Sequence, residues 1–279
     1  RTLASNADNY EDFSPPQLSS DEVPEFIYSY ARLSGNLHWT RLSTGQQFTH
    51  TLCSYRFKSG SSWCIAPGKC LYVTGGRILR TSREVVSIDL SRDFSVSEKP
   101  LMKSARSSHN SVLNRGFIYA IGGFNNTQLK ECERLALDGT EWEPLPAIPT
   151  GVHRPSLLLE KSSQVLYVLG GTYLDLIQEL SLERLEWRVL DLKLPSVSYS
   201  IANFKHGSEV YLIQGGDLFL LDLAGSQIHL IKHLPTNTFT FFGPNYLSKG
   251  TLYAAYNKGP VQYLQLGSLS KEEQESEVL

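Results

Sequence analysis

FIYAIGG, residues 117–123, is an alternating apolar run that ends in two glycines. Near-copies stand at 70–76 (CLYVTGG), 166–171 (LYVLGG) and 210–216 (VYLIQGG). Such alternation is typical of a β-strand, and glycine often marks the point where a strand ends or another backbone comes close. Because the glycines recur with the strand, they indicate a repeated structural unit and not a glycine-rich ligand loop.

The tyrosine inside each copy measures the repeat. Weaker matches extend the series to FIYSYA near the N-terminus and TLYAAYN near the C-terminus, and successive markers are 42 to 48 residues apart. The markers are Tyr28, Tyr72, Tyr119, Tyr167, Tyr211 and Tyr253. Six periods of this length indicate a repeat architecture that covers nearly the whole chain.

Each period has the same interior. A polar stretch follows the glycines, and a second alternating run comes next, at 84–90, 131–137, 177–183 and 217–223. After a short turn a further run often opens with an aromatic residue, as at Phe94, Trp142 and Trp187. One more apolar run leads into the next marker. Four short strands per period, separated by turn residues, are therefore predicted.

The predicted fold is all-β: a six-bladed β-propeller of four-stranded antiparallel blades. A single sheet of this kind cannot bury both faces, whereas six sheets arranged radially pack on one another. No segment follows a 3.6-residue period for 12 residues, which excludes a helical solenoid. We assign residues 26–266 to the propeller and treat 1–25 and 267–279 as acidic ends, and we expect the N-terminal segment to complete the last blade.

The repeat resembles the kelch repeat. The resemblance rests on the glycine pair after the second strand, on Glu133-Arg134 in the third strand and on Trp142 at the start of the fourth. It covers about residues 26–266 and is clearest in periods two to five. The first and sixth periods have Ala31-Arg32 and Tyr256-Asn257 where the glycines are expected. The tryptophan–aspartate type of propeller has a similar period, but its signatures do not occur in this sequence.

Residues 102–123 are most similar to the repeats of BTB–kelch proteins, which are substrate adaptors of cullin-3 ubiquitin ligases. In that group an arginine before the first strand of a blade commonly faces the binding pocket, and Arg106 occupies the matching position. The resemblance thus implies a protein-binding domain that connects to cullin-3 through a BTB domain outside this sequence. It also implies a cytoplasmic location, with nuclear or cytoskeletal placement as further options.

Enzymatic chemistry is not expected. The chain lacks the nucleophile-elbow, zinc-protease, phosphate-loop and dinucleotide-binding motifs. Its seven histidines are scattered over the periods and its four cysteines lack metal-ligand spacing, so we expect no metal and no cofactor. Residues 26–270 hold 24 Lys/Arg against 18 Asp/Glu, a balance too weak to predict nucleic-acid binding. There is no apolar run of 18 residues, and none is expected to enter a membrane.

The candidate site lies on loops. Propeller strands alternate in direction, so the loops between strands two and three and the loops between blades emerge on one face. These loops hold ten Arg or Lys residues: Arg56, Lys58, Arg77, Arg80, Arg83, Lys103, Arg106, Lys130, Arg154 and Lys258. Asp175 is the one acidic residue that this interpretation places among them. The expected ligand is therefore a peptide or acidic segment of a partner protein, because arginine binds carboxylates through two parallel hydrogen bonds.

The candidate partner-binding residues combine arginines with tyrosine, asparagine and other polar groups of the same loops. They are Arg77, Arg80, Arg83, Arg106, Ser107, His109, Asn125, Asn126, His153, Arg154, Tyr173, Tyr199 and Phe239. Two other functions stay open at this point. Kelch propellers also form actin-associated scaffolds, and galactose oxidase is a copper enzyme on a kelch-like propeller.

Overall fold

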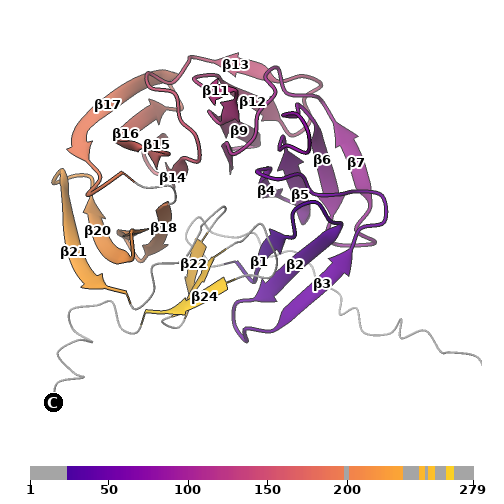
Figure 1. Cartoon of the computed structure of the whole chain (residues 1–279), viewed down its shortest axis with the longest axis horizontal. Coiled ribbons are helices and arrows are strands. Elements are labelled where there is room, and N and C mark those ends of the chain that lie inside the picture. Colours follow the sequence, from indigo (N-terminus) through magenta and orange to yellow (C-terminus); the bar gives the residue numbers. More distant parts are fainter. Residues whose placement is uncertain (1–23, 198–200, 235–244, 249–250, 255–261, 267–279) are drawn as a thin grey trace, which may run out of the picture.

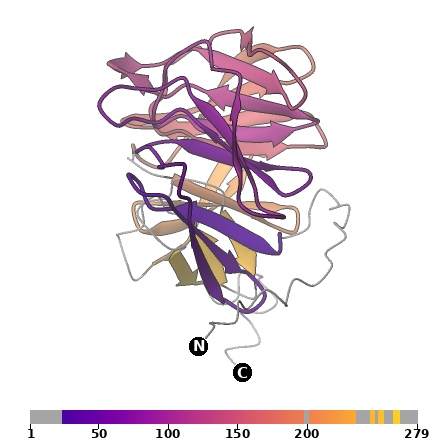
Figure 2. The ribbon, with the colours of Figure 1, turned by 90° about the vertical axis from the view of Figure 1, so that its right-hand side faces the viewer.

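The structure is a computed structural model that describes residues 24–197, 201–234, 245–248, 251–254 and 262–266. Within these residues all regular structure is β: six sheets form blades around a central axis, and a seventh is a two-stranded hairpin (Figure 1). Figure 2 shows the same ring from its side. The predicted six-bladed propeller is confirmed. No helix in the described part of the chain is long and apolar enough to cross a membrane.

Four blades contain four antiparallel strands, which follow one another from the axis outwards. Blade 2 consists of β4 (Ser62–Ala66), β5 (Cys70–Thr74), β6 (Val85–Asp89) and β7 (Val96–Lys99). Blade 3 consists of β8 (Asn110–Asn114), β9 (Phe117–Ile121), β12 (Cys132–Ala136) and β13 (Glu143–Leu145). A small hairpin of β10 (Phe124–Asn125) and β11 (Thr127–Gln128) lies in the loop between β9 and β12.

Blades 4 and 5 have longer outer strands. Blade 4 consists of β14 (Ser156–Glu160), β15 (Val165–Gly171), β16 (Leu174–Ser181) and β17 (Glu186–Lys193). Blade 5 consists of β18 (Ile201–His206), β19 (Glu209–Gln214), β20 (Asp217–Asp222) and β21 (Gln227–His233). The first strands of blades 2 to 6 contact one another in sequence and line the axis.

Blades 1 and 6 each show three strands in the described residues. Blade 1 consists of β1 (Phe26–Tyr30), β2 (Asn36–Arg41) and β3 (Gln47–Thr51). Blade 6 consists of β22 (Asn245–Ser248), β23 (Thr251–Ala254) and β24 (Gln262–Gln265). By its place in the repeat, β1 corresponds to a second strand, and β24 to a third. The closing strand expected from the N-terminal segment lies outside the described residues.

The repeated strand is buried because a neighbouring blade covers each of its faces. In β9, Ile118 and Ala120 pack with Tyr72 and Met102 of the blade 2 side. Alternate residues Tyr119 and Ile121 pack with the blade 4 residues Leu166, Val168 and Leu180. All four β9 side chains are at most 3% exposed. Burial on two sides explains why the strand is apolar almost throughout, although its residues still alternate between the two seams.

The glycine pair ends the strand where the loops of two blades meet. Gly122 and Gly123 have φ angles of 59° and 110°, and the Gly123 amide donates a hydrogen bond to Val152 O at 2.8 Å. A Cβ on Gly123 would lie 2.8 Å from the Cβ of His109. The backbone conformation and the close approach both require glycine, so the repeat of the pair follows from blade geometry.

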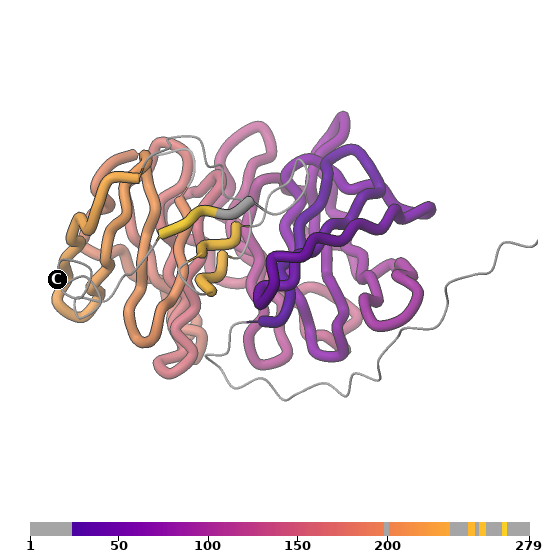
Figure 3. The backbone as a smooth tube through the Cα atoms, turned by 90° about the horizontal axis from the view of Figure 1, so that it is seen from below, coloured from indigo at the N-terminus to yellow at the C-terminus, as the bar shows by residue number. Residues whose placement is uncertain are grey.

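Blade 6 meets blade 1 through aromatic residues. Tyr246 and Tyr253 pack against the cluster that contains Ile27 and Leu37 of blade 1. Burial raises the pKa of Tyr246 to about 12. Figure 1 and Figure 3 both place the indigo and yellow ends of the described chain side by side. The two weakest periods of the sequence are therefore the two neighbours at which the ring meets.

We expect Trp142→Ala to lower the free energy of unfolding by about 3–5 kcal/mol, because it removes a large side chain from a seam. Trp142 is 1% exposed and its indole NH donates to Pro100 O at 2.9 Å, which joins blade 3 to the end of blade 2. Chemical denaturation measures the loss.

Trp187→Ala is the matched control. Trp187 makes the equivalent bond one blade later, to Pro146 O at 2.8 Å, but its side chain is half-buried. We expect a loss of about 1–2 kcal/mol for this variant. Equal losses for the two tryptophans would contradict the assignment of the stability to seam burial.

Candidate functional site

The site is built on one face of the ring, which we call the loop face. It consists of the loops between second and third strands and the loops between blades. These loops pair by isolated antiparallel bridges, which join Ser59 to Arg77, Ser82 to Arg106, Ser107 to Phe124 and Leu129 to Val152. Because each bridge connects a loop within a blade to a loop between blades, the two kinds of loop lie on the same face, as the topology predicts.

One backbone position repeats on this face. Gly60, Ser108 and Arg154 precede the first strands of blades 2, 3 and 4 and have φ angles of 68°, 51° and 60°. The Ser108 amide donates to Gly60 O at 2.6 Å, and the Arg154 amide donates to Ser108 O at 2.8 Å. The loops of successive blades are thus joined in series by their main chains. This arrangement fixes the backbone of the face and leaves the side chains to vary.

The most prominent feature of the face is the loop 77–81, which we call the tip. A bridge between Arg77 and Thr81 closes it, and a second hydrogen bond, from Ser82 N to Gly76 O at 2.9 Å, holds its base. Arg77 and Arg80 are exposed, as expected from the sequence. Between them, Ile78 and Leu79 are 56% and 87% exposed.

Sequence reasoning missed Ile78 and Leu79 as site residues. Only the arginines of this loop were predicted to bind a partner. The available signal was their position: two apolar residues between two arginines, in a segment predicted to be a surface loop. Exposed apolar residues also occur elsewhere on the loops of this face, at Leu33, Leu101 and Val197. The face therefore combines apolar and cationic groups.

Three further candidates border the tip. Arg83 is exposed, and its Nε donates to Met102 O. Asn125 accepts a hydrogen bond at 2.6 Å from the hydroxyl of Thr81, so the loops of blades 2 and 3 touch at the tip. Asn126 is exposed at the turn of the small hairpin, with a φ of 66°. These residues and the tip form one continuous part of the face.

His153, Arg154 and Tyr173 belong to the blade 4 side. The His153 ring lies 5.0 Å from the Phe124 ring, and burial, followed by the Arg154 charge, lowers the pKa of His153 to about 4. Arg154 is half-buried, and Tyr173 is 64% exposed with a φ of 64°. Tyr173 is thus available for contact, whereas His153 stays neutral at physiological pH. Tyr199 and Phe239 lie outside the described residues.

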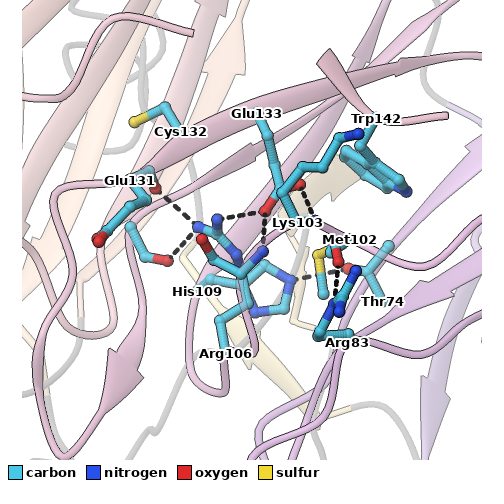
Figure 4. Close-up of polar contacts among 12 residues, drawn as sticks. Thr74, Arg83, Met102, Lys103, Arg106, His109, Glu131, Cys132, Glu133 and Trp142 are labelled. Atoms are coloured by element: carbon cyan, nitrogen blue, oxygen red, sulfur yellow. Dashed lines mark hydrogen bonds and ion pairs between the residues drawn. The ribbon is translucent and has the colours of Figure 1, made fainter. Parts of the chain in front are cut away.

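The expected pocket-facing position of Arg106 is wrong. Its side chain is 0% exposed and donates to Gly122 O at 2.6 Å, to Glu131 O at 2.8 Å and to the Glu133 carboxylate at 2.5 Å (Figure 4). A guanidinium in the protein interior needs an acidic partner and several acceptors, and blade 3 supplies a carboxylate and two carbonyls to its terminal nitrogens, whereas Nε has no hydrogen-bond partner among the described residues. Arg106 is therefore a structural residue of blade 3.

Ser107 and His109 are also buried, at 5% and 6% exposure, so they do not present a binding surface. His109 Nε2 lies 2.8 Å from the Thr74 hydroxyl, across the seam between blades 2 and 3. Burial, with the Arg106 charge as a second cause, lowers the pKa of His109 well below its ordinary value. The resemblance to a pocket arginine, and the position of these residues in a loop between blades, led to the prediction that Arg106, Ser107 and His109 are exposed. The structure places all three in the interior.

The positive charge of the face is smaller than the sequence predicted. Lys58 pairs with Glu84, Lys103 pairs with Glu141 at 2.7 Å, and Arg106 pairs with Glu133. These acids stand next to or within the third and fourth strands, where counting loop residues alone overlooked them. Arg56, Arg77, Arg80, Arg83 and Lys130 form no ion pair with any described residue. The remaining charge is thus concentrated at the tip, because Arg77 and Arg80 lie in it and Arg83 lies just beyond it.

Nothing in the described part of the chain assembles a metal-binding group of three or more His, Cys, Asp or Glu side chains. The four cysteines are free, and burial raises the pKa of Cys132 to about 11. What the arrangement offers is contact chemistry: guanidinium donors, an exposed tyrosine and two exposed aliphatic side chains on a backbone held by cross-loop hydrogen bonds.

No family model matches the chain. Among curated proteins it is similar to Kelch-like protein 38 of Homo sapiens and of Mus musculus. Each match is 27% identical over 139 residues and covers 45% of this chain and 23% of the relative. The chain therefore spans about a quarter of the length of the relatives it matches. The six-bladed ring and these similarities together support a kelch-repeat propeller and a protein-interaction domain.

We expect His109→Gln to reduce the loss of stability on acidification. A histidine whose folded pKa is depressed contributes stability that is present above its unfolded pKa, near 6.5, and is lost as the pH falls below it. The loss is about 1.4 kcal/mol per pH unit while the side chain stays neutral in the folded state. Between pH 6.5 and 5, the variant should therefore lose less stability than the unmodified protein, by up to about 2 kcal/mol.

Chemical denaturation at the two pH values measures this difference. Glutamine can still hydrogen-bond to Thr74, so the comparison isolates the titration, and His153 contributes equally to both proteins. Identical pH dependence in the two proteins would contradict a neutral, buried His109.

Proposed function

We propose that this kelch-repeat propeller captures a partner protein on its loop face, and that the bound segment carries carboxylates beside an apolar side chain. One observation carries the proposal. Ile78 and Leu79 are exposed between the exposed Arg77 and Arg80, on a tip closed by a backbone bridge. Exposing two large aliphatic side chains on a constrained loop is unfavourable in water, and such groups commonly mark an interaction site.

The two kinds of side chain on the tip have different roles in binding. Burying Leu79 and Ile78 against a partner supplies favourable hydrophobic free energy, about 25 cal/mol for each Å² of apolar surface removed from water. The arginines steer a carboxylate-bearing partner and fix its orientation by paired hydrogen bonds. Because the backbone of the tip is already ordered, binding costs less conformational entropy than it would on a flexible loop.

We propose further that the domain is the substrate receptor of a cullin-RING ubiquitin ligase in the cytoplasm. The resemblance of residues 102–123 to BTB–kelch adaptors supports this role, and so does the similarity to proteins named Kelch-like. A cullin-3 connection would run through a BTB domain in the same polypeptide. Sequencing the complete transcript tests this part: a BTB domain upstream supports it, and its absence from the full reading frame refutes it.

A quantitative pull-down tests the binding face. We expect the triple variant Arg77→Ala/Leu79→Ser/Arg80→Ala to lose at least 90% of the recovered partners, because it removes the exposed charge and apolar surface together. Truncation of one buried, hydrogen-bonded charge at an interface costs about 2–5 kcal/mol, and each 1.4 kcal/mol is a tenfold change in affinity.

Arg92→Ala/Arg115→Ala is the control. Both arginines are exposed and stand in turns at the opposite ends of the strands, so the variant changes the charge but not the loop face. It should recover every partner at the unmodified level. Equal recovery by the triple variant, with its folding unchanged, would refute the proposed face.

A further inference from the structure

The side chains of the buried pair Arg106 and Glu133 make their hydrogen bonds to each other and to the main chain around blade 3. The guanidinium holds the carbonyls of Gly122 and Glu131 and one oxygen of Glu133. The carboxylate in turn accepts the amide of Lys103 at 2.6 Å and the amide of Ser104 at 3.2 Å (Figure 4). Both side chains are at most 1% exposed, so the two charged groups are shielded from water.

The main chain of Arg106, however, is hydrogen-bonded to the residues at the two ends of the tip of blade 2. Its amide donates to Ser82 O at 3.1 Å, and its carbonyl accepts the amide of Gly76 at 2.9 Å. Gly76 and Ser82 are the two residues that bracket the tip. One residue beyond Ser82, Arg83 O accepts the amide of Met102 at 2.9 Å. The peptide units of Arg106 thus hold both ends of a loop that lies in another blade.

The tip has one other backbone anchor, at Arg77, which exchanges hydrogen bonds of 2.8 and 3.0 Å with Ser59. The outermost side chains of the tip, Ile78 and Leu79, are 56% and 87% exposed and add little packing. Besides the backbone bridges, the structure provides one side-chain tie among the described residues, from Thr81 to Asn125 at 2.6 Å. A loop without buried apolar contacts is held by its hydrogen bonds, and these are only as rigid as the groups that accept them.

We infer that the Arg106–Glu133 pair is the positioning device of the binding tip: it fixes the peptide on which the tip is built. A buried ion pair resists displacement because movement of either partner leaves an uncompensated charge away from water. The guanidinium cannot shift without breaking three bonds at once. Arg106 therefore contributes to binding through the tip's backbone and not through contact with a ligand.

Hydrogen exchange resolved by mass spectrometry tests this inference on the unmodified chain and on Glu133→Gln. We expect amides of residues 76–83 to exchange at least tenfold faster in the variant, while β15 and β19 stay within twofold. Glu143→Gln is the matched control, since Glu143 pairs with Arg134 in the same blade at 2.9 Å but is 53% exposed. It should leave the exchange of the tip within twofold. Thr81→Val measures the separate tie to Asn125 and should have the smaller effect.

Two results would overturn the inference. One is exchange of the tip in Glu133→Gln within twofold of the unmodified chain. The other is an equal acceleration in all blades, which would indicate a general structural role. If Glu133→Gln fails to fold, the unmodified protein still decides. Native-state exchange in low urea should show the amides of Lys103 and Ser104 opening together with residues 76–83, with the same urea dependence, and separate openings would refute the coupling.

The inference rests on the proposed function only where it gives the tip a role in binding. Exchange is measured without any partner, so its result is independent of the pull-down. Coupled exchange together with unchanged partner recovery would retain the positioning device and reject the tip as the binding site.

Discussion

Each blade buries both faces of its inner strands only because another blade covers each face. Ile118 and Tyr119 are neighbours in β9, yet they belong to different cores, one shared with blade 2 and one with blade 4. No blade has a complete core of its own, so stability belongs to the seams and the chain must form a ring. The packing of the blades also determines where the loops of the loop face lie, because each loop begins and ends on a strand that is fixed in a seam.

The burial of each inner strand between two other blades explains why most of the fold could be predicted from the sequence. Packing on two sides demands a similar apolar strand in each blade, and the positive φ angles at the end of that strand demand the glycine pair in blades 2 to 5, so period and fold follow together. Blades 1 and 6 were harder to predict for the same reason. Blades 1 and 6 meet through Tyr246 and Tyr253 against Ile27, and a contact that occurs once leaves no repeat to recognise.

The site was predicted only in part, because a repeat pattern locates loops but does not tell which loop side chains turn inward. Arg77, Arg80 and Tyr173 are exposed as expected, whereas Arg106 is buried on Glu133. The signal for Arg106 lay in the strand. Glu133 stands in a strand beside the buried Cys132 and Leu135, and an acid that such a strand buries needs a cationic partner. Pairing the buried acids first would have removed Arg106 from the surface arginines.

On the loop face, the backbone conformation is fixed by the fold, whereas the side chains can differ from blade to blade. The main chain at Gly60, Ser108 and Arg154 has the same left-handed conformation in three successive blades, although three different side chains stand there. The same cross-loop hydrogen bonds occur with Gly, Ser and Arg at this position, so it accepts side chains of different chemistry. Partner choice therefore depends on side chains such as Leu79 and Arg80, which contribute least to folding, while the buried Arg106–Glu133 pair keeps their backbone in place.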